Sequence, residues 1–419
     1  MLLTWSHKLR YRRQRVQQST TTAKTLARVF RKRQMNGVQV LMAFVLITAD
    51  SMRSWTCPDA CICLTPKKIL CNSGHLTFVP LGNLPKTVEH LSMTKNNLTY
   101  LPSDAFSGLR CLRKLTLDGN SIESVERFAF RGLPRLRELS IQNTPLTSLQ
   151  KFSFASLQNV TAILLGYNKI SVIDEFAFAG TANIRLLLLN NNPLHTVSAN
   201  AFSGLTNVEH IIMPSGIRDL QPDAFNGLDS VGLLRLAFMD LSSLRPYTFR
   251  GLSHVHVLAV QDSDLGVIRA DAFSGLTHVG SLNLLNNKID SIQSLAVTDD
   301  NRVKHFRFNG NHVLESPKRG SFALVTINDS TVISNHFPCD CHLFRFVDGR
   351  PFGNLSYESF TGKNYCISPL ELNGQSVSVV KRSFVDKCLQ SSLAATLVAA
   401  PPSRTFLITV AMFLFVFVR

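Results

Sequence analysis

The residues best suited to covalent chemistry are the cysteines, of which the chain has nine. One cluster lies between residues 57 and 71, a second lies between residues 339 and 388, and Cys111 stands alone. Clustered thiols either oxidise to disulfides or bind zinc. We expect disulfides, because each cluster holds an even set and a signal-peptide-like segment precedes them. The predicted disulfide cysteines are Cys57, Cys61, Cys63, Cys71, Cys339, Cys341, Cys366 and Cys388.

The ninth cysteine, Cys111, lies within the repeats described below. We expect a partly buried free thiol there, in preference to an intermolecular bridge. Four asparagines lie in N-x-S/T sequons, which accept N-linked glycans in secreted proteins. They are Asn97, Asn159, Asn328 and Asn354. Together the sequons and the cysteines predict an extracellular glycoprotein.

Signatures of catalysis are absent from the sequence. It has no Gly-rich phosphate loop, no H-E-x-x-H motif and no G-x-S-x-G motif. His254, His256 and His278 are near one another in the chain, but they occupy repeat positions and are expected to be structural or surface residues. We therefore expect no enzyme activity, no metal and no cofactor.

Basic residues are concentrated at the two ends of the chain. The sequence has 44 Lys and Arg against 28 Asp and Glu, a formal net charge of +16. Ten of the basic residues fall within residues 1–36, and Arg404 and Arg419 flank an apolar tail. Residues 50–395 keep 32 basic and 28 acidic residues, or +4. This mildly basic body gives no reason to expect nucleic-acid binding.

The N-terminal segment, residues 1–49, reads as a basic leader followed by a signal peptide. Residues 38–49 form an apolar run of twelve residues, which suits a signal-peptide core and is too short to span a bilayer. The basic part is long for a signal peptide, and Met35 offers an alternative start. An uncleaved N-terminal membrane anchor is the competing interpretation.

The C-terminal segment, residues 389–419, resembles a glycosylphosphatidylinositol attachment signal. Small residues are followed by a polar spacer and then by the apolar run 405–418. The expected attachment residues are Ser391, Ser392 and Ala394. A short membrane span and a merely adhesive apolar tail are the alternatives.

A repeat of 24 residues must position all of these groups. Phenylalanine recurs at this interval, with one step of 23, at Phe106, Phe130, Phe154, Phe178, Phe202, Phe225, Phe249 and Phe273. The pattern L-x-L-x-x-N-x-L accompanies it in ten copies over residues 91–313. In each L-x-L, both apolar side chains point inward and the middle residue points to the other face of a short strand. No copy can bury its apolar face alone, so stacking supplies the core.

This pattern and its flanking cysteines resemble the extracellular leucine-rich repeat family with cysteine-rich N- and C-terminal flanks, which includes proteins of chaoptin, connectin and Nogo-receptor architecture. The resemblance implies a leucine-rich repeat solenoid, a curved horseshoe with a parallel concave β-sheet and loops or short helices on its convex side. It implies an N-terminal cap over 57–90 and a C-terminal cap over 314–388. It also implies four disulfides, namely Cys57–Cys63, Cys61–Cys71, Cys339–Cys366 and Cys341–Cys388.

The exposed middle residues of the L-x-L strands form a column along the concave sheet. The column is polar at its ends, but repeats four to six place Leu164, Leu188 and Ile212 in succession, followed by Arg235. Tyr167 and Phe238 lie one column over. An exposed apolar strip with aromatic residues at its rim predicts a partner-binding surface. The alternative is that a loop or a shifted strand register covers it.

The asparagine of the repeat is missing close to this strip. Its positions hold Thr144 in repeat three, then Gly216, Met239 and Ser263 in repeats six to eight. We therefore expect repeats four to eight to form the partner surface.

The predicted function is that of a cell-surface glycoprotein on the outer face of the plasma membrane, which binds an extracellular protein ligand or receptor in adhesion or as a co-receptor. The alternatives are a secreted matrix protein and an ectodomain that captures hormones or innate-immune ligands. A second copy of the chain, as a homodimer, is a further candidate partner.

Overall fold

The computed structural model describes residues 57–297, 302–324, 327, 329–352 and 355–398. The chain divides into residues 1–56 and a second unit that begins at Cys57, and the description concerns this second unit. The predicted leader, the apolar C-terminal run and two sequons (Asn328 and Asn354) lie outside the described residues.

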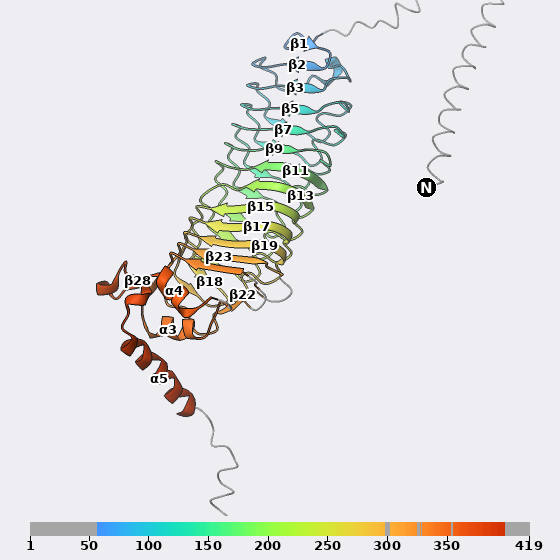
Figure 1. Cartoon of the computed structure of the whole chain (residues 1–419). Coiled ribbons are helices and arrows are strands. Elements are labelled where there is room, and N and C mark those ends of the chain that lie inside the picture. The colour runs from blue at the N-terminus through green and yellow to red at the C-terminus, as the bar shows by residue number, and fades with distance from the viewer. Residues whose placement is uncertain (1–56, 298–301, 325–326, 328, 353–354, 399–419) are drawn as a thin grey trace, which may run out of the picture. The chain divides into compact units, whose positions relative to one another are not determined.

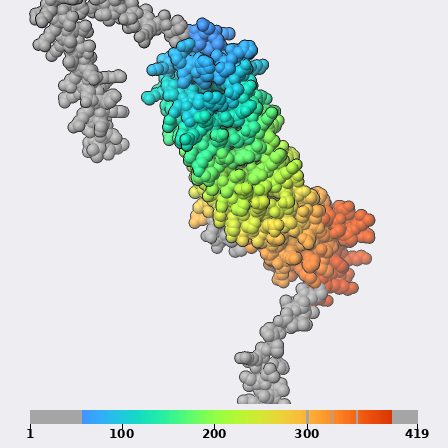
Figure 2. Space-filling view, turned by 180° about the vertical axis from the view of Figure 1, so that it is seen from behind, coloured from blue at the N-terminus to red at the C-terminus, as the bar shows by residue number. Residues whose placement is uncertain are grey.

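One sheet of 13 strands runs through the described unit, and its strands stack in chain order (Figure 1). The first pair of strands is antiparallel and every later pair is parallel. Figure 2 shows the same order from behind, as successive bands of colour. The strands are β1 (Ile62–Thr65), β2 (Lys68–Leu70), β3 (His90–Ser92), β5 (Lys114–Thr116), β7 (Glu138–Ser140), β9 (Ala162–Leu164), β11 (Thr181–Leu188), β13 (Leu205–Ile212), β15 (Asp229–Ala237), β17 (Ser253–Gln261), β19 (Thr277–Leu285), β23 (His305–Asn309) and β26 (Asp329–Ile333).

The ten predicted repeats supply the strands from β3 to β23. Their register places each repeat residue beside its equivalent, as Leu91 beside Leu115. An eleventh turn follows, because β26 pairs with β23 in the same register. The predicted parallel solenoid is therefore confirmed, and its sheet extends one strand into the segment expected to be the C-terminal cap.

The side of the solenoid opposite the sheet consists of loops and very short strands. No helix occurs among the described residues of the array. Instead, short segments of successive turns pair in parallel. The hydrogen bonds between them satisfy backbone N–H and C=O groups that a helix would satisfy within itself. These strands are β4 (Tyr100–Leu101), β6 (Ser124–Val125), β8 (Ser148–Leu149), β10 (Val172–Ile173), β12 (Thr196–Val197), β14 (Asp219–Leu220), β16 (Ser243–Leu244), β18 (Val267–Ile268), β20 (Lys288–Ile289), β21 (Ser291–Ile292), β22 (Leu295–Val297), β24 (His312–Val313) and β25 (Phe322–Leu324).

The recurring phenylalanines form a continuous buried stack in the core. The ring centroids of neighbours are 5.2–6.3 Å apart from Phe106 to Phe273. The step of 23 residues does not interrupt it, since Phe202 and Phe225 lie 5.8 Å apart. The missing residue falls between Ile212 and Asp219, in a turn that contains Gly216, whose φ of 80° lies in the left-handed region that glycine adopts at little cost.

Asparagine side chains form a buried ladder beside the stack. In the C-terminal turns, Asn311 Nδ2 donates to the Leu284 carbonyl at 2.9 Å. Its Oδ1 accepts from the Asn287 backbone N–H at 2.9 Å. Where the repeat lacks asparagine, the hydroxyl of Ser263 takes part of this role by accepting from the Met239 backbone N–H. The ladder thus satisfies backbone groups that the turns leave unpaired.

Asn311→Ala is expected to lower the free energy of unfolding by at least about 2 kcal/mol, because each buried group left without a partner costs about 1–3 kcal/mol. Chemical denaturation of the purified chain measures this loss. The matched control is Asn373→Ala at an exposed position, where a change within about 0.5 kcal/mol is expected. Equal effects of the two substitutions would contradict a structural role for the ladder.

Disulfides close both ends of the array. The bonds are Cys57–Cys63, Cys61–Cys71, Cys339–Cys366 and Cys341–Cys388, the pairs that the family resemblance implies. At the C-terminal end, Asp340 caps a helix by accepting from the backbone N–H groups of His342 and Leu343. This cap contains β27 (His336–Pro338), α3 (Cys341–Asp348), α4 (Tyr357–Lys363), β28 (Tyr365–Ser368), η3 (Leu370–Leu372), η4 (Val377–Val379) and α5 (Arg382–Val398), and the N-terminal cap contains η1 (Leu81–Asn83).

The last helix, α5, contains the predicted attachment residues Ser391, Ser392 and Ala394. Among the residues that the structure describes, neither α5 nor any other helix has the length and apolar character needed to cross a bilayer.

Candidate partner-binding surface

The predicted column of middle residues exists as a physical row on the sheet. Successive members are direct cross-strand partners throughout. The row reads Ser92, Thr116, Ser140, Leu164, Leu188, Ile212, Arg235, Ala259, Asn283 and Arg307. The structure therefore brings together four of the six predicted site residues, Leu164, Leu188, Ile212 and Arg235, in adjacent strands.

The centre of the row is open to solvent. Ile212 is 43% exposed, and Leu164 and Leu188 are half-buried. No shift in strand register hides these residues, because β9, β11 and β13 pair without a break. The alternative in which the strip is covered does not hold for the described residues.

The two predicted aromatic residues are more exposed than Ile212. Tyr167 is 53% and Phe238 is 58% exposed, each with φ in the left-handed region. They occupy equivalent positions in repeats four and seven, so two turns separate them. The structure therefore places them along the same margin of the sheet and does not bring them into contact.

A second apolar row lies beside the first, and sequence reasoning missed it. Two residues before each member of the first row, the strands carry Ala162, Leu186, Leu233 and Val257, with His210 between Leu186 and Leu233. Residues two apart on a strand share a face, and all four apolar side chains are partly exposed. The period of two along each strand was the signal that could have found them. Together the rows make a largely apolar surface over repeats four to eight, called the apolar sheet face below, in which His210 and Arg235 take two of the positions and Ala259 is buried.

The sheet is also widest here. Within the 13-stranded sheet, the five strands from β11 to β19 have eight or nine residues, whereas the four strands from β3 to β9 have three. Each extended strand passes through one residue in the left-handed region, such as Asn183, Ser230 or His254. The broad, regularly paired sheet gives the apolar sheet face a rigid base.

Few charges interrupt the apolar sheet face. Arg235 is exposed on it, and among the described residues no carboxylate lies within ion-pair distance of its guanidinium. Beside the second row, Glu209 lies 3.5 Å from His210 Nε2. Depletion of charge around a single arginine is typical of the centre of a protein interface.

A cluster of histidines lies at the margin where the extended strands begin. The rings of His254 and His278 stack at 4.7 Å, and His254 Nδ1 is 2.8 Å from Asp229. Burial raises the pKa of Asp229, but hydrogen bonds from Ser253, Ser230 and His254 outweigh burial, so this pKa is lowered. In the described part of the chain, no three His, Cys, Asp or Glu side chains are arranged to hold a metal ion.

The other predicted residues lie away from the apolar sheet face. The sequon residues Asn97 and Asn159 are exposed, and Asn159 Nδ2 donates to the Pro134 carbonyl at 3.0 Å. Cys111 is a half-buried free thiol, and Arg135 Nη1 lies 4.0 Å from its sulfur.

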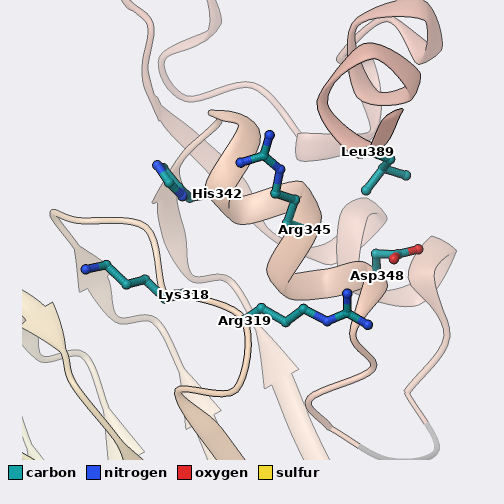
Figure 3. Close-up of a pocket in the computed structure, with 6 residues that line it drawn as sticks. All are labelled: Lys318, Arg319, His342, Arg345, Asp348 and Leu389. Atoms are coloured by element: carbon teal, nitrogen blue, oxygen red, sulfur yellow. The ribbon is translucent and has the colours of Figure 1, made fainter. Parts of the chain in front are cut away.

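A pocket of about 260 Å³ lies at the C-terminal cap (Figure 3). Figure 3 shows that its basic side chains do not converge, because Arg345 points towards α5, Arg319 points towards Asp348, and Lys318 extends away from both. Arg345 Nε donates to the Cys388 carbonyl at 3.0 Å. The side chains therefore do not form a centre for an anion. The lining residues are Lys318, Arg319, His342, Arg345, Asp348 and Leu389.

Comparison with family models matches the repeats. Residues 99–232 match six copies of the BspA type leucine rich repeat region, and residues 69–122 match a leucine rich repeat model. The chain is 34% identical over 88 residues to immunoglobulin superfamily member 10 of Rattus norvegicus. That match takes in 21% of this chain and only 3% of the length of the rat protein.

The chain is also similar to solved structures. Human 5T4, also titled Wnt-activated inhibitory factor 1 or trophoblast glycoprotein, has a TM-score of 0.39 and 21% identity, covering 78% of this chain and 98% of that one. The mouse RP105/MD-1 complex has a TM-score of 0.47 and 19% identity, covering 75% of this chain and 54% of that one.

Proposed function

Because this chain is a leucine-rich repeat protein of the kind with cysteine-rich flanks, its array closed by disulfides at both ends, we propose that it binds an extracellular protein partner through the apolar sheet face. In this proposal it acts in adhesion or as a co-receptor, and a transmembrane partner carries any signal. The observation that carries the proposal is the partly exposed, largely apolar surface that the two rows form over repeats four to eight.

Physical chemistry supports a protein as the partner. A soluble protein rarely exposes apolar side chains side by side over several strands unless another surface covers them. Apolar contacts around one arginine and two aromatic residues supply the kind of contact that dominates protein interfaces. A polar or charged ligand, such as a sugar or a nucleotide, would leave these side chains in unfavourable contact with polar groups.

The experiment for this proposal uses cells that display the full chain. They are screened against a library of extracellular proteins, and each hit is retested with Leu188→Glu. A protein that binds the wild-type chain and not the variant supports the proposal. If every hit binds both chains equally, the apolar sheet face is not the binding surface.

The proposed attachment to the membrane through a lipid predicts release by phosphatidylinositol-specific phospholipase C. We expect the enzyme to remove most of the chain from intact cells, because only the lipid would hold it. Flow cytometry measures the release, and N-terminal sequencing of the released protein locates the mature start. A chain that stays on treated cells would indicate a membrane span, and one found only in the medium would indicate a matrix protein.

A further inference from the structure

The net charge is distributed unevenly along residues 57–313. Residues 57–161 contain 12 basic and 7 acidic residues, or +5, whereas residues 162–313 contain 11 basic and 13 acidic residues, or −2. The mild overall charge of the body therefore hides a basic N-terminal third and a slightly acidic centre.

Five basic residues of this N-terminal part lie in the segments that come just before the strands of the first three repeats. Arg113 and Arg137 occupy neighbouring rungs, since the Arg137 backbone N–H donates to the Arg113 carbonyl at 2.7 Å. Lys86 and Arg110 occupy equivalent positions in successive turns, 24 residues apart. Arg135 lies one turn further along and reaches Cys111, the residue after Arg110. All five cationic side chains are exposed, and we call them the basic edge.

Carboxylates neutralise little of the basic edge. Among the described residues, the one ion pair that involves it joins Arg113 Nε to Glu89 at 3.2 Å. Glu89 is shared with Lys67, whose hydrogen bond keeps the pKa of Glu89 below its ordinary value. The nearby Glu138 is paired with Lys114. Lys86, Arg110, Arg135 and Arg137 therefore present charge that no carboxylate within 4 Å offsets in the described structure.

We propose that the basic edge binds a sulfated glycosaminoglycan. Successive turns of the array lie about 4.8 Å apart, so the cations form a row along the stacking direction that suits a linear polymer with repeating anionic groups. Four of the five are arginines, whose planar guanidinium groups bind oxyanions in pairs of parallel hydrogen bonds.

An acidic protein fits the basic edge less well. A protein interface generally needs apolar or aromatic side chains at its centre. None of the exposed large apolar side chains belongs to the segments that carry the basic edge, residues 86–89, 110–113 and 135–137. The inference depends on an extracellular location and not on partner binding by the apolar sheet face.

The test measures affinity of the purified full chain for immobilised heparin. Wild-type chain is expected to bind at about 0.15 M salt, with affinity that falls steeply as salt rises because bound counterions are released. The triple variant Arg110→Gln, Arg135→Gln, Arg137→Gln is expected to bind at least tenfold more weakly and with a shallower salt dependence. The matched control removes three exposed cations elsewhere, as Lys169→Gln, Arg269→Gln, Lys304→Gln, and is expected to change affinity less than twofold.

Equal losses in the two triple variants would overturn the proposal, because overall charge would then explain binding, and so would a wild-type chain that does not bind heparin. Thermal unfolding of both variants verifies that they remain folded.

Beads coated with the full chain should lose binding to cells treated with heparan sulfate lyase. Binding that survives the lyase and is lost in the Arg110, Arg135 and Arg137 variant would indicate an acidic protein and contradict the proposal. The Leu188→Glu variant should keep the heparin affinity of the wild-type chain. Heparin binding would then be independent of partner binding by the apolar sheet face.

Discussion

Phe202→Ala is expected to lower the free energy of unfolding by about 3–5 kcal/mol. The ring of Phe202 is fully buried, and it lies 6.3 Å from Phe178 and 5.8 Å from Phe225 between ring centroids. Removing it leaves a cavity in the middle of the stack and takes contacts from both neighbouring turns. Each turn of a solenoid is stabilised mainly by its neighbours, so the loss weakens the array on both sides of repeat five.

Chemical denaturation of the purified chain, followed by circular dichroism, measures this change. Phe238→Ala is the matched control, since it removes the same ring from a position that is 58% exposed. The control is expected to change stability by less than about 1 kcal/mol. A loss at Phe202 no larger than the loss at Phe238 would mean that the stack does not hold the array together.

Ile212→Glu is expected to weaken partner binding by about two orders of magnitude, or about 3 kcal/mol. Ile212 lies at the centre of the first row, between Leu188 and Arg235. Covering a new carboxylate with an apolar partner surface removes its water without a compensating charge. Arg235 is one strand away and offers partial compensation, so Leu188→Glu, two strands from Arg235, is expected to have the larger effect.

Binding titrations with the partner from the screen measure both effects. Val172→Glu provides the control, because Val172 is exposed to the same degree, 42% against 43%, but lies on β10, outside the sheet. The control chain should bind as the wild-type chain does. If Val172→Glu weakened binding as much as Ile212→Glu, the added charge alone would explain the effect.

The sequence predicted the parts of the fold that depend on the repeat period. The L-x-L spacing predicted ten strands and the row from Ser92 to Arg307. Side chains alternate between the two faces of a strand, so burying both apolar residues of each L-x-L places the middle residue on the other face. The family resemblance implied the same disulfide pairs that the structure contains. Spacing alone could not select them, since four cysteines allow three pairings.

The parts that were missed lie outside the L-x-L pattern. The second apolar row, with Leu186 and Leu233, was missed because the L-x-L pattern begins one residue after it, although the period of two along each strand includes it. The length of the extended strands was also missed, because each contains a residue with left-handed backbone angles, such as Ser230, and non-glycine residues adopt these angles only rarely. The eleventh strand, Asp329–Ile333, was missed because Ser330 stands at the first leucine position, although Val332 and Asn335 keep the later positions of the pattern and Asn335 continues the ladder.

Hydroxyl-radical footprinting of the full chain, with and without the partner found in the screen, shows whether that partner covers the apolar sheet face. We expect reduced oxidation of Leu188, Ile212 and Phe238 in the complex, with no change at Val172 on β10. Unchanged oxidation at Leu188 and Ile212, with protection elsewhere on the array, would contradict the proposal.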